Sequence, residues 1–498
     1  MRAIDKHIEQ LIEQATLEGL IETRDMIYVR NQIIHLLGLQ SIQVTSTHGE
    51  KRSIPDILED LVQYAIENKV IENVFDEKEM FTANVMNCFI PRPSDVERQF
   101  YEKYNIIPKL ATDYFYKLSE TSNYIQTKRI AQNIHFKKET TYGELDITIN
   151  LSKPEKDPEQ IRREREMKKQ AIDYPPCVLC VENEGYVGRT GYAARANHRM
   201  IKMKIADEAW YFQYSPYVYY NEHSILLSEE HRDMVINRDT FKRLLAFVEQ
   251  FPHYFIGSNA DLPIVGGSIL SHDHYQAGNY NFAMVEAKEI ETIQLRRYPN
   301  VSAAILQWPL SVIRLRSQQL EDLIEVADDI FQAWKGYSDE SVGILSHTGN
   351  ERHNTVTPIA RKRNNEYELD IVLRNNRTTA EAPDGLFHPH QNVQHIKKEN
   401  IGLIEVMGLA VLPARLKDEL QAIEASLQGK ETKVAPYHQP WVNQLKESYG
   451  VHNDAAQAKE IVEEELAKKF VRVLEDTGVF KQTDEGIAAF KRFMSKWQ

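Results

Sequence analysis

Residues 261–278 read DLPIVGGSILSHDHYQAG, and this stretch carries the strongest local signal in the sequence. His272, His274 and Gln276 stand at every second position. A β-strand with this spacing places all three side chains on one face. Seventeen histidines in 498 residues produce roughly 0.6 His-x-His pairs by chance, so the pair alone decides little. The residues that come just before the pair make it more informative.

Two glycines and a serine, Gly266, Gly267 and Ser268, come just before the histidines. Because glycine lets the backbone approach a ligand closely, the N–H groups of this segment can reach an anion. Glycines by themselves more often mark a turn. We take Gly267, Ser268 and Ser271 as candidate substrate-binding residues.

The chain has three cysteines, and two of them, Cys177 and Cys180, form a Cys-x-x-Cys pair. Chance predicts about 0.02 such pairs, so this spacing is informative. Two thiolates across a tight turn suit tetrahedral zinc, with His223 and His272 as the best candidates for the other two ligands. A thioredoxin-like redox pair is the competing interpretation, but the order of strand, motif and helix expected for it is missing from this sequence. Two unpaired cysteines in the core are the remaining alternative.

Residues 188–199 read GRTGYAARANHR. Arg189 and Arg199 are candidates to hold a phosphate by bidentate hydrogen bonds, and Asn197 is a candidate to reach a ribose. Taken singly, each is more often a surface residue. His388 and His390 form a second His-x-His pair. Two interpretations of this pair stay open: a metal or substrate site, or exposed histidines before a strand.

Composition excludes several classes of protein. The net charge is -13, so the chain repels polyanions and we expect no nucleic-acid partner. The most apolar window, residues 401–412, is too short to span a bilayer. The first ten residues carry charges where a signal peptide needs an apolar core, so we expect a cytoplasmic protein. Three cysteines cannot build a disulfide framework.

The hydrophobic spacing predicts an α+β fold of mainly antiparallel sheets with packed helices, behind a helical N-terminal region. We expect three parts, at residues 1–130, 131–315 and 316–498, with a boundary between family domains nearer residue 240. The two sheet regions leave room for a duplicated fold. The predicted helices are residues 4–20, 24–37, 54–70, 96–122, 153–169, 240–250, 323–334 and 455–474. The predicted strands are residues 140–151, 355–359, 366–373 and 401–412.

Residues 261–278 resemble the signature of the class II galactose-1-phosphate uridylyltransferases of Gram-positive bacteria. Further segments with this resemblance cover nearly the whole chain, among them FIPRPS, CVLCVENEGYVGR, FQYSPYVYYNEH and the long stretch LRNNRTTAEAPDGLFHPHQNVQHIKKENIGLIEVMGLAVLPARL. A small departure is Ala277, where we expect glycine more often.

The resemblance implies a histidine-triad-like fold in which the second histidine of the motif, His274, is the nucleophile. Gln276 is then expected to donate to the phosphoryl oxygens. A structural zinc held by Cys177, Cys180, His223 and His272 follows the ligand order of the class I enzymes. The expected reaction moves UMP from UDP-glucose to galactose 1-phosphate through a uridylyl-histidine, in a ping-pong mechanism. Related enzymes act as dimers, so we expect a homodimer.

Two other functions are compatible with the residues. The same nucleophile with water or phosphate as acceptor makes a nucleotide hydrolase or phosphorylase. A zinc-stabilised interaction protein, with the helical N-terminal region as the partner surface, is the non-enzymatic alternative.

Overall fold

The computed structural model describes residues 2–44, 52–152, 173–267, 269–452 and 454–498. They form two compact units. The first unit consists of Met1–Gln132, Ser152–Val218 and Glu222–His231, and the second consists of Asn133–Leu151, Tyr219–Asn221 and Arg232–Gln498. The helix predicted at residues 153–169 lies outside the described residues. The division of the sequence at residues 130 and 315 stays a prediction.

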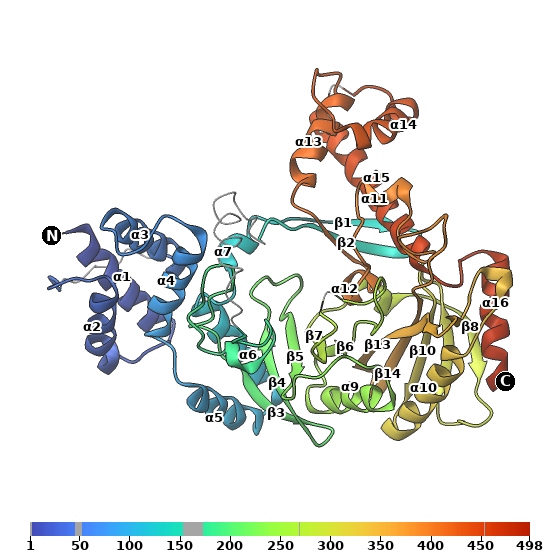
Figure 1. The fold of residues 1–498 in the computed structure, drawn as a ribbon, viewed down its shortest axis with the longest axis horizontal. Coiled ribbons are helices and arrows are strands. Elements are labelled where there is room, and N and C mark those ends of the chain that lie inside the picture. Colours follow the sequence, from blue (N-terminus) through green and yellow to red (C-terminus); the bar gives the residue numbers. More distant parts are fainter. Residues whose placement is uncertain (1, 45–51, 153–172, 268, 453) are drawn as a thin grey trace. The chain divides into compact units, whose positions relative to one another are not determined.

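Helices occupy the first 130 residues of the first unit (Figure 1), and three of them match the predicted ranges 4–20, 24–37 and 54–70. The predicted helix over residues 96–122 is two helices, and the helix Phe75–Asn87 was not predicted. In α1, Ile4, Ile8 and Leu11 lie on one buried face. Pro93 and Pro108 begin α5 and α6, because proline lacks an N–H that the first helical turn leaves unpaired. The helices are α1 (Ala3–Leu17), α2 (Met26–Leu36), α3 (Ile54–Glu67), α4 (Phe75–Asn87), α5 (Pro93–Tyr104), α6 (Pro108–Thr121) and α7 (Thr127–Ile130).

Three strands follow in the first unit and pair antiparallel in the order β3-β4-β5. Its strands are β3 (Ile201–Ile205), β4 (Glu208–Tyr214) and β5 (Ser224–Ser228). Ala206 and Asp207 connect β3 to β4, and both have positive φ, 48° and 69°. Positive φ at both central residues is the property of the type I′ turn, whose twist matches that of a hairpin. The strand β5 ends three residues before His231.

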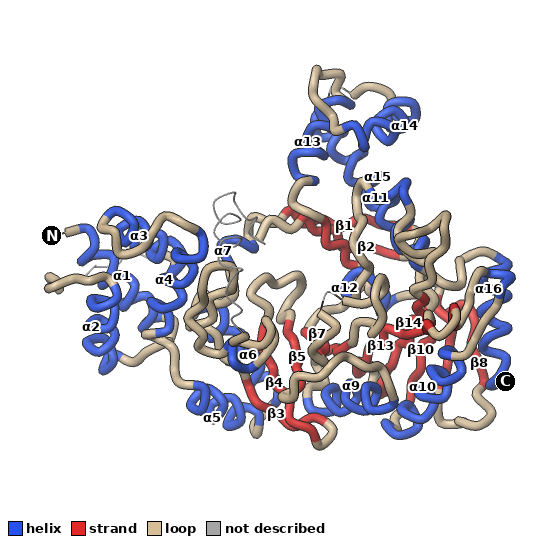
Figure 2. The backbone as a smooth tube through the Cα atoms, viewed as in Figure 1, coloured by secondary structure: helices blue, strands red, loops and turns tan. Residues whose placement is uncertain are grey.

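In the second unit, seven strands pair antiparallel in the order β7-β6-β13-β14-β10-β9-β8. Strands are drawn in red in Figure 2. Two helices, α9 (Arg238–Gln250) and α10 (Leu320–Lys335), pack against each other and against β13. The predicted α+β class with mainly antiparallel sheets is therefore confirmed. The strands are β6 (Phe255–Gly257), β7 (His274–Gly278), β8 (Glu289–Gln294), β9 (Ser302–Leu306), β10 (Val312–Ser317), β13 (Asn354–Arg363) and β14 (Glu366–Asn375).

A smaller sheet of the second unit joins distant segments, because β15 (Leu409–Leu412) pairs in parallel with β2 (Gly143–Ile149), which pairs with β1 (Ile134–Thr140). The prediction of one strand over residues 401–412 is wrong. Its first part forms the short helix α12 (Leu403–Val406), and the chain turns at Gly408, with φ 105°, before β15 begins. Apart from Glu405 this run is apolar, so it has no periodicity that separates a buried helix from a buried strand.

The C-terminal part of the second unit is helical. α13 (Leu416–Leu427), α14 (Gln439–Tyr449) and α15 (Ala455–Thr477) pack together, and α15 also contacts β1. α16 (Asp484–Met494) follows. One hydrophobic cluster connects the apolar faces of α13, α14 and α15 with the β1-β2-β15 sheet and with Trp308. The helix predicted at residues 455–474 is thus part of the core of this unit.

Charged residues are buried between β10, β13 and β14. Asp370 is 0% exposed, and its carboxylate accepts hydrogen bonds from Arg314 at 2.7 and 2.8 Å and from Arg361 Nη1 at 2.8 Å. Burial opposes ionisation, but the guanidinium groups of Arg361 and Arg314 outweigh it and lower the pKa of Asp370. Because each cation depends on this carboxylate, the set is stable only when complete.

Replacing Asp370 with asparagine should reduce the free energy of unfolding by about 3 to 5 kcal/mol, since two buried guanidinium groups lose their nearest counter-ion and keep only Glu368, at 3.3 and 3.5 Å. Denaturant titration of both proteins measures this change. The exposed carboxylate of Asp328 on α10 provides a control, and Asp328→Asn should change stability by less than about 0.5 kcal/mol. The lowered pKa of Asp370 means that its contribution is lost only below about pH 4, as the carboxylate is protonated. Equal stability of Asp370→Asn and the native chain at pH 7 would contradict this account.

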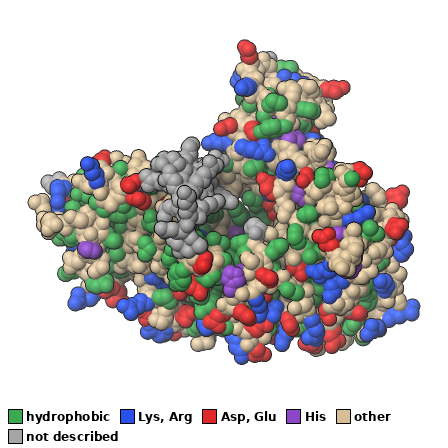
Figure 3. Space-filling view, in the orientation of Figure 1, with side chains coloured by type: hydrophobic (Ala, Val, Ile, Leu, Met, Phe, Trp, Pro, Cys, Tyr) green, Lys and Arg blue, Asp and Glu red, His purple; other side chains and the backbone are tan. Residues whose placement is uncertain are grey.

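The surface shown in Figure 3 carries acidic and basic side chains interspersed. Over the whole sequence, 73 Asp and Glu outnumber 60 Lys and Arg. Among the helices that the structure describes, none is both long enough and apolar enough to cross a bilayer.

Candidate active site and metal centre

The two glycines of the motif are required by close packing in the second unit. A Cβ on Gly266 would lie 2.5 Å from the carbonyl oxygen of Ala260 and 2.6 Å from that of Leu262. A Cβ on Gly267 would lie 2.7 Å from Nδ2 of Asn259. All three distances are too short for a real Cβ atom. The glycines therefore allow the loop before β7 to fold back on itself.

This loop is held in a strained conformation. Ile264 has φ 74°, which is an outlier for a β-branched residue. The carboxylate of Asp261 fixes the loop, because it accepts hydrogen bonds from the N–H of Ile236 at 3.0 Å and from Arg352 Nη2 at 3.0 Å. Thr355 also donates to it. Such strain persists only where surrounding contacts enforce it, and it concentrates at functional sites.

His274 is the first residue of β7, and its side chain is 7% exposed. Its Nδ1 lies 2.8 Å from the backbone oxygen of His272. A carbonyl oxygen only accepts, so Nδ1 carries the proton and donates. The lone pair of the ring is then on Nε2. Burial lowers the pKa of His274, which keeps the imidazole neutral near pH 7. These are the properties of a nucleophilic histidine.

Gln276 is two residues further along β7, opposite Gly257 of β6, and is half-buried. The two-residue period of a strand places it on the same face as His274. His272 precedes the strand, so the prediction that all three motif residues belong to one strand holds only for His274 and Gln276.

Asp273, between the two histidines, anchors the entry to β7. Its backbone N–H donates to the carbonyl oxygen of Arg232 at 2.7 Å. Its buried carboxylate lies 3.2 Å from Arg232 Nη2 and 3.9 Å from Arg243 Nη1, which comes from α9. No pattern in the sequence indicated a role for this residue. The contacts fix the backbone that positions the His274 ring.

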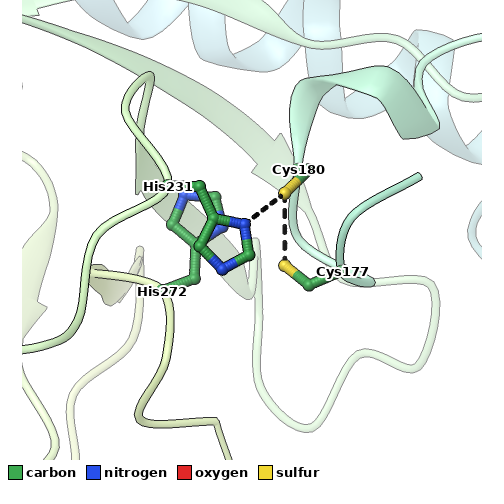
Figure 4. Close-up of side chains that lie close together, drawn as sticks. All are labelled: Cys177, Cys180, His231 and His272. Carbon is green, nitrogen blue, oxygen red and sulfur yellow. Dashed lines mark hydrogen bonds between the residues drawn. The ribbon is translucent and has the colours of Figure 1, made fainter. Parts of the chain in front are cut away.

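The first unit brings three metal-ligand side chains together. The Sγ atoms of Cys177 and Cys180 are 3.4 Å apart, and Nδ1 of His231 is 3.1 Å from Cys180 Sγ. Figure 4 shows both cysteines and His231 as sticks, with His272, a residue of the second unit. Asn183 holds the cysteine loop, because its Nδ2 donates to the carbonyl oxygens of Cys177 and Cys180, both at 2.8 Å.

Two sulfurs and one imidazole nitrogen are a donor set typical of zinc. One ligand atom of each residue lies within 4.8 Å of the others, and ligands of tetrahedral zinc stand about 3.6 to 3.8 Å apart. Burial, followed by the hydrogen bond to Cys177, raises the pKa of the Cys180 thiol to about 12. Without a cation this thiol is therefore protonated at neutral pH, whereas a bound metal stabilises the thiolate. The residues fit a metal ion.

The structure corrects the third ligand, since His231 and not His223 lies beside the cysteines. His223 comes just before β5, and its carbonyl oxygen accepts from the N–H of Ser215 at 2.8 Å. His231 comes after β5, a strand of five residues that spans about 16 Å. The two histidines therefore lie toward opposite ends of that strand. No predicted helix, strand or motif indicated His231, which follows the short apolar run at residues 225–227.

The candidate phosphate-binding arginines both make contacts within the first unit. Arg199 donates to the carbonyl oxygens of Pro91, Ala196 and His198 and to Asn87 Oδ1, at 2.8 to 3.1 Å. Four of its five N–H groups thus have partners, which favours a structural role. Arg189 donates to the carbonyl oxygen of Tyr174 at 2.8 Å, and its guanidinium lies 4.3 Å over the ring of Tyr192.

Asn197 donates to the carbonyl oxygen of Ser122 at 3.0 Å, and with Arg195 it lines a small cavity of about 30 Å³ in the first unit. Its predicted contact with a ribose stays a prediction. Ser271 is exposed, and Ser268 lies outside the described residues.

The second His-x-His pair is not a matched pair of ligands. His388 is 4% exposed, so the alternative of exposed histidines does not hold for it. Burial lowers its pKa. His390 is half-exposed, and its Nδ1 lies 3.3 Å from the buried carboxylate of Asp476. Its backbone N–H donates to the same carboxylate at 3.0 Å.

Comparison with known proteins agrees with the signature. The family model described as "Galactose-1-phosphate uridyl transferase, N-terminal domain" matches residues 19–233, and the corresponding C-terminal domain matches residues 247–443. The boundary between them is close to the expected residue 240.

Curated relatives match over nearly the full length of both chains. A galactose-1-phosphate uridylyltransferase of Clostridium perfringens (strain SM101 / Type A) is 49% identical over 98% of this chain and 97% of its own. The protein of the same name from Ligilactobacillus salivarius is 49% identical over 99% of this chain and 98% of its own. A solved structure of yeast Ap4A phosphorylase Apa2 is 10% identical, with a TM-score of 0.33, over 66% of this chain and 90% of that one. The chain belongs to the galactose-1-phosphate uridylyltransferase family.

Proposed function

We propose that this protein transfers UMP from UDP-glucose to galactose 1-phosphate and releases glucose 1-phosphate and UDP-galactose. Membership of the family and the names of the curated relatives support the activity. The observation that carries the mechanism is the hydrogen bond from Nδ1 of His274 to the backbone oxygen of His272, at 2.8 Å. It leaves a lone pair on Nε2, in a ring that burial keeps neutral.

In the first half-reaction, Nε2 of His274 attacks the α-phosphorus of UDP-glucose. A bond forms between nitrogen and phosphorus, and the bond from that phosphorus to the oxygen of glucose 1-phosphate breaks, with the electron pair leaving on that oxygen. No proton has to be transferred. The ring becomes positively charged, and the hydrogen bond from Nδ1–H to the carbonyl oxygen of His272 becomes stronger as this charge develops.

The second half-reaction reverses the first with a different sugar. A phosphate oxygen of galactose 1-phosphate attacks the same phosphorus, and the bond to Nε2 breaks, which restores the neutral imidazole. The leaving and attacking groups are sugar phosphates of nearly equal basicity, so the exchange is close to balanced. Neither half-reaction requires a general base for an alcohol.

Gln276 is the proposed donor to the phosphoryl oxygens. It shares one face of β7 with His274, and its neutral amide stabilises charge that develops on oxygen in the transition state. Backbone N–H groups of Gly267, Ser268 and Ser271 are further candidates for this role. Arg189, Asn197 and Arg199 stay candidates for the nucleotide, although the hydrogen bonds of Arg199 within the first unit argue against its involvement.

Zinc is the proposed metal, and His272 is the proposed fourth ligand beside Cys177, Cys180 and His231. Structural zinc sites use closed sets of four cysteines and histidines, and three such side chains are together in the first unit. His272 is also the residue whose backbone oxygen orients the His274 ring. A metal bound there supplies structural rigidity: His272 would hold the backbone that fixes the nucleophile.

A two-substrate assay tests this function. The full chain is incubated with UDP-glucose and galactose 1-phosphate, and all four sugar phosphates and nucleotides are quantified by chromatography. We expect equimolar UDP-galactose and glucose 1-phosphate and no free UMP. Release of UMP into water, or of UDP when inorganic phosphate is added, without any UDP-galactose, would replace the transferase by the hydrolase or phosphorylase. Inertness toward every nucleotide sugar would favour the interaction protein.

Homodimerisation and a cytoplasmic location stay predictions. The net charge of -13 supports the expectation that the protein does not bind nucleic acid, because a polyanion would be repelled.

A further inference from the structure

The C-terminal helices of the second unit surround a cavity of about 610 Å³. It lies where α13, α14 and α15 meet the short helix α11 (Gln391–Gln394), and these helices are drawn in orange and red in Figure 1. None of its lining residues belongs to the motif around His274. The lining residues are Gln391, Asn392, Gln394, His395, Arg415, Tyr437, Pro440, Trp441, Gln444 and Lys469.

The charge of this lining differs from that of the chain. The sequence carries a net charge of -13, yet the described residues that line the cavity include two cations, Arg415 and Lys469, of which Arg415 is paired with the carboxylate of Glu419. Lys469 is half-buried, and burial lowers its pKa, although the carboxylate of Glu465 acts in the opposite direction. Its Nζ donates at 3.4 Å to the carbonyl oxygen of Asn392. An anion in the cavity would provide Lys469 with a stronger partner.

Arg415, the second cation, is held in place at the rim. Its Nη1 donates to Glu419 at 2.6 Å, and its Nη2 donates to the backbone oxygen of His395 at 3.0 Å. Pro440 and Trp441 belong to the first turn of α14, so the positive end of that helix dipole also lies at the cavity. Figure 3 shows Lys, Arg and His side chains beneath the projecting α13 and α14 helices.

A chain of hydrogen bonds makes the wall rigid. Nδ1 of His395 and Nδ1 of His438 are 2.7 Å apart, and Nε2 of His438 lies 2.9 Å from the carboxylate of Glu419. The hydroxyl of Tyr437 donates a hydrogen bond to the same carboxylate. His438 is 0% exposed. The side chains around the cavity are therefore positioned before any ligand arrives, which reduces the entropy lost on binding.

We propose that this cavity binds a phosphorylated sugar, at a site separate from the reacting histidine. Arg415 and Lys469 provide charge for the phosphate group. The carboxamides of Gln391 and Gln444 can donate to and accept from hydroxyl groups, whereas Gln394 can only accept, because its Nε2 donates to Asp384 and to the carbonyl oxygen of Pro389. The exposed ring of Tyr437 offers aromatic surface for the apolar face of a sugar ring. The proposal does not depend on the chemistry assigned to His274.

Calorimetric titration of the full chain with glucose 6-phosphate tests the site, with inorganic phosphate and glucose as separate probes. We expect binding of glucose 6-phosphate with a Kd of about 1 mM or tighter, weaker binding of phosphate and none of glucose. Lys469→Gln should weaken binding by roughly tenfold, because the fully charged partner of the phosphate is lost. Lys459→Gln, on the same helix but exposed and outside the lining, is the matched control and should bind like the native chain.

A second pair of variants avoids deleting a cation. Gln444→Glu introduces a carboxylate of nearly the same shape into the lining and should weaken binding by roughly tenfold through repulsion. Asn443→Asp, its exposed neighbour, should leave the affinity unchanged. Circular dichroism checks that each variant is folded.

Three outcomes would overturn the proposal. One is absence of heat with glucose 6-phosphate up to about 10 mM. Another is unchanged affinity in both Lys469→Gln and Gln444→Glu, because the ligand would then bind elsewhere. The third is equal weakening in the two control variants, since a general charge effect would explain it. Transferase activity is measured separately, so failure of this site and failure of the proposed function can be distinguished.

Discussion

Replacing His274 with asparagine should abolish formation of a covalent uridylyl-protein and reduce the transfer rate by roughly 10⁴-fold or more. Asparagine retains a side chain that can donate to the carbonyl oxygen of His272, but it has no basic nitrogen to attack phosphorus. Intact-protein mass spectrometry after incubation with UDP-glucose, without any acceptor, measures the first effect. The native chain should gain a single uridylyl group, and addition of galactose 1-phosphate should remove it.

The control for this variant is His347→Asn. His347 is exposed on the short strand β11 (His347–Thr348), so its replacement should leave both labelling and turnover unchanged. A uridylyl group that still attaches to folded His274→Asn would show that another residue is the nucleophile. If neither the native chain nor His274→Asn is labelled while turnover stays rapid, the sugar phosphates exchange directly and no covalent intermediate forms.

Replacing His231 with alanine should remove the bound metal, whereas replacing His223 with alanine should leave it in place. His231 Nδ1 lies 3.1 Å from the Cys180 sulfur, but His223 lies before β5 rather than after it. Zinc content by mass spectrometry should fall from about one ion per chain to near zero in His231→Ala. The free energy of unfolding should decrease by several kcal/mol, because the metal stabilises the folded chain.

His223→Ala provides a demanding control, since His223 is only 4% exposed and its loss also costs packing. Both variants should therefore be less stable than the native chain, and only the metal content separates them. Full zinc in His231→Ala together with loss of zinc in His223→Ala would restore the ligand set inferred from the sequence. Full zinc in both would remove each histidine from the set.

Local patterns in the sequence predicted much of the fold. The first three amphipathic helices and the strands around residues 355–373 appear where the spacing of apolar residues predicts them, whereas the helix Phe75–Asn87 was missed and the predicted helix over residues 96–122 is two helices. This works because residues three or four apart on a helix, or two apart on a strand, share one face. The run at residues 401–412 has no such period, and its division into a short helix and β15 depends on the glycine turn and on pairing with β2, a strand more than 250 residues away.

By itself, the sequence determined the α+β class and the Cys-x-x-Cys pair, because each depends on residues close together in the chain. The candidate nucleophile, His274, came from the resemblance of residues 261–278 to a family signature. Only the tertiary structure decided that His231 is the histidine beside the cysteines, that Nδ1 of His274 donates to a backbone oxygen, and that Arg199 is surrounded by carbonyl groups. The physical reason is distance. A ligand set or a hydrogen-bond partner is chosen by where strands end and loops return, and spacing along the chain does not contain that information.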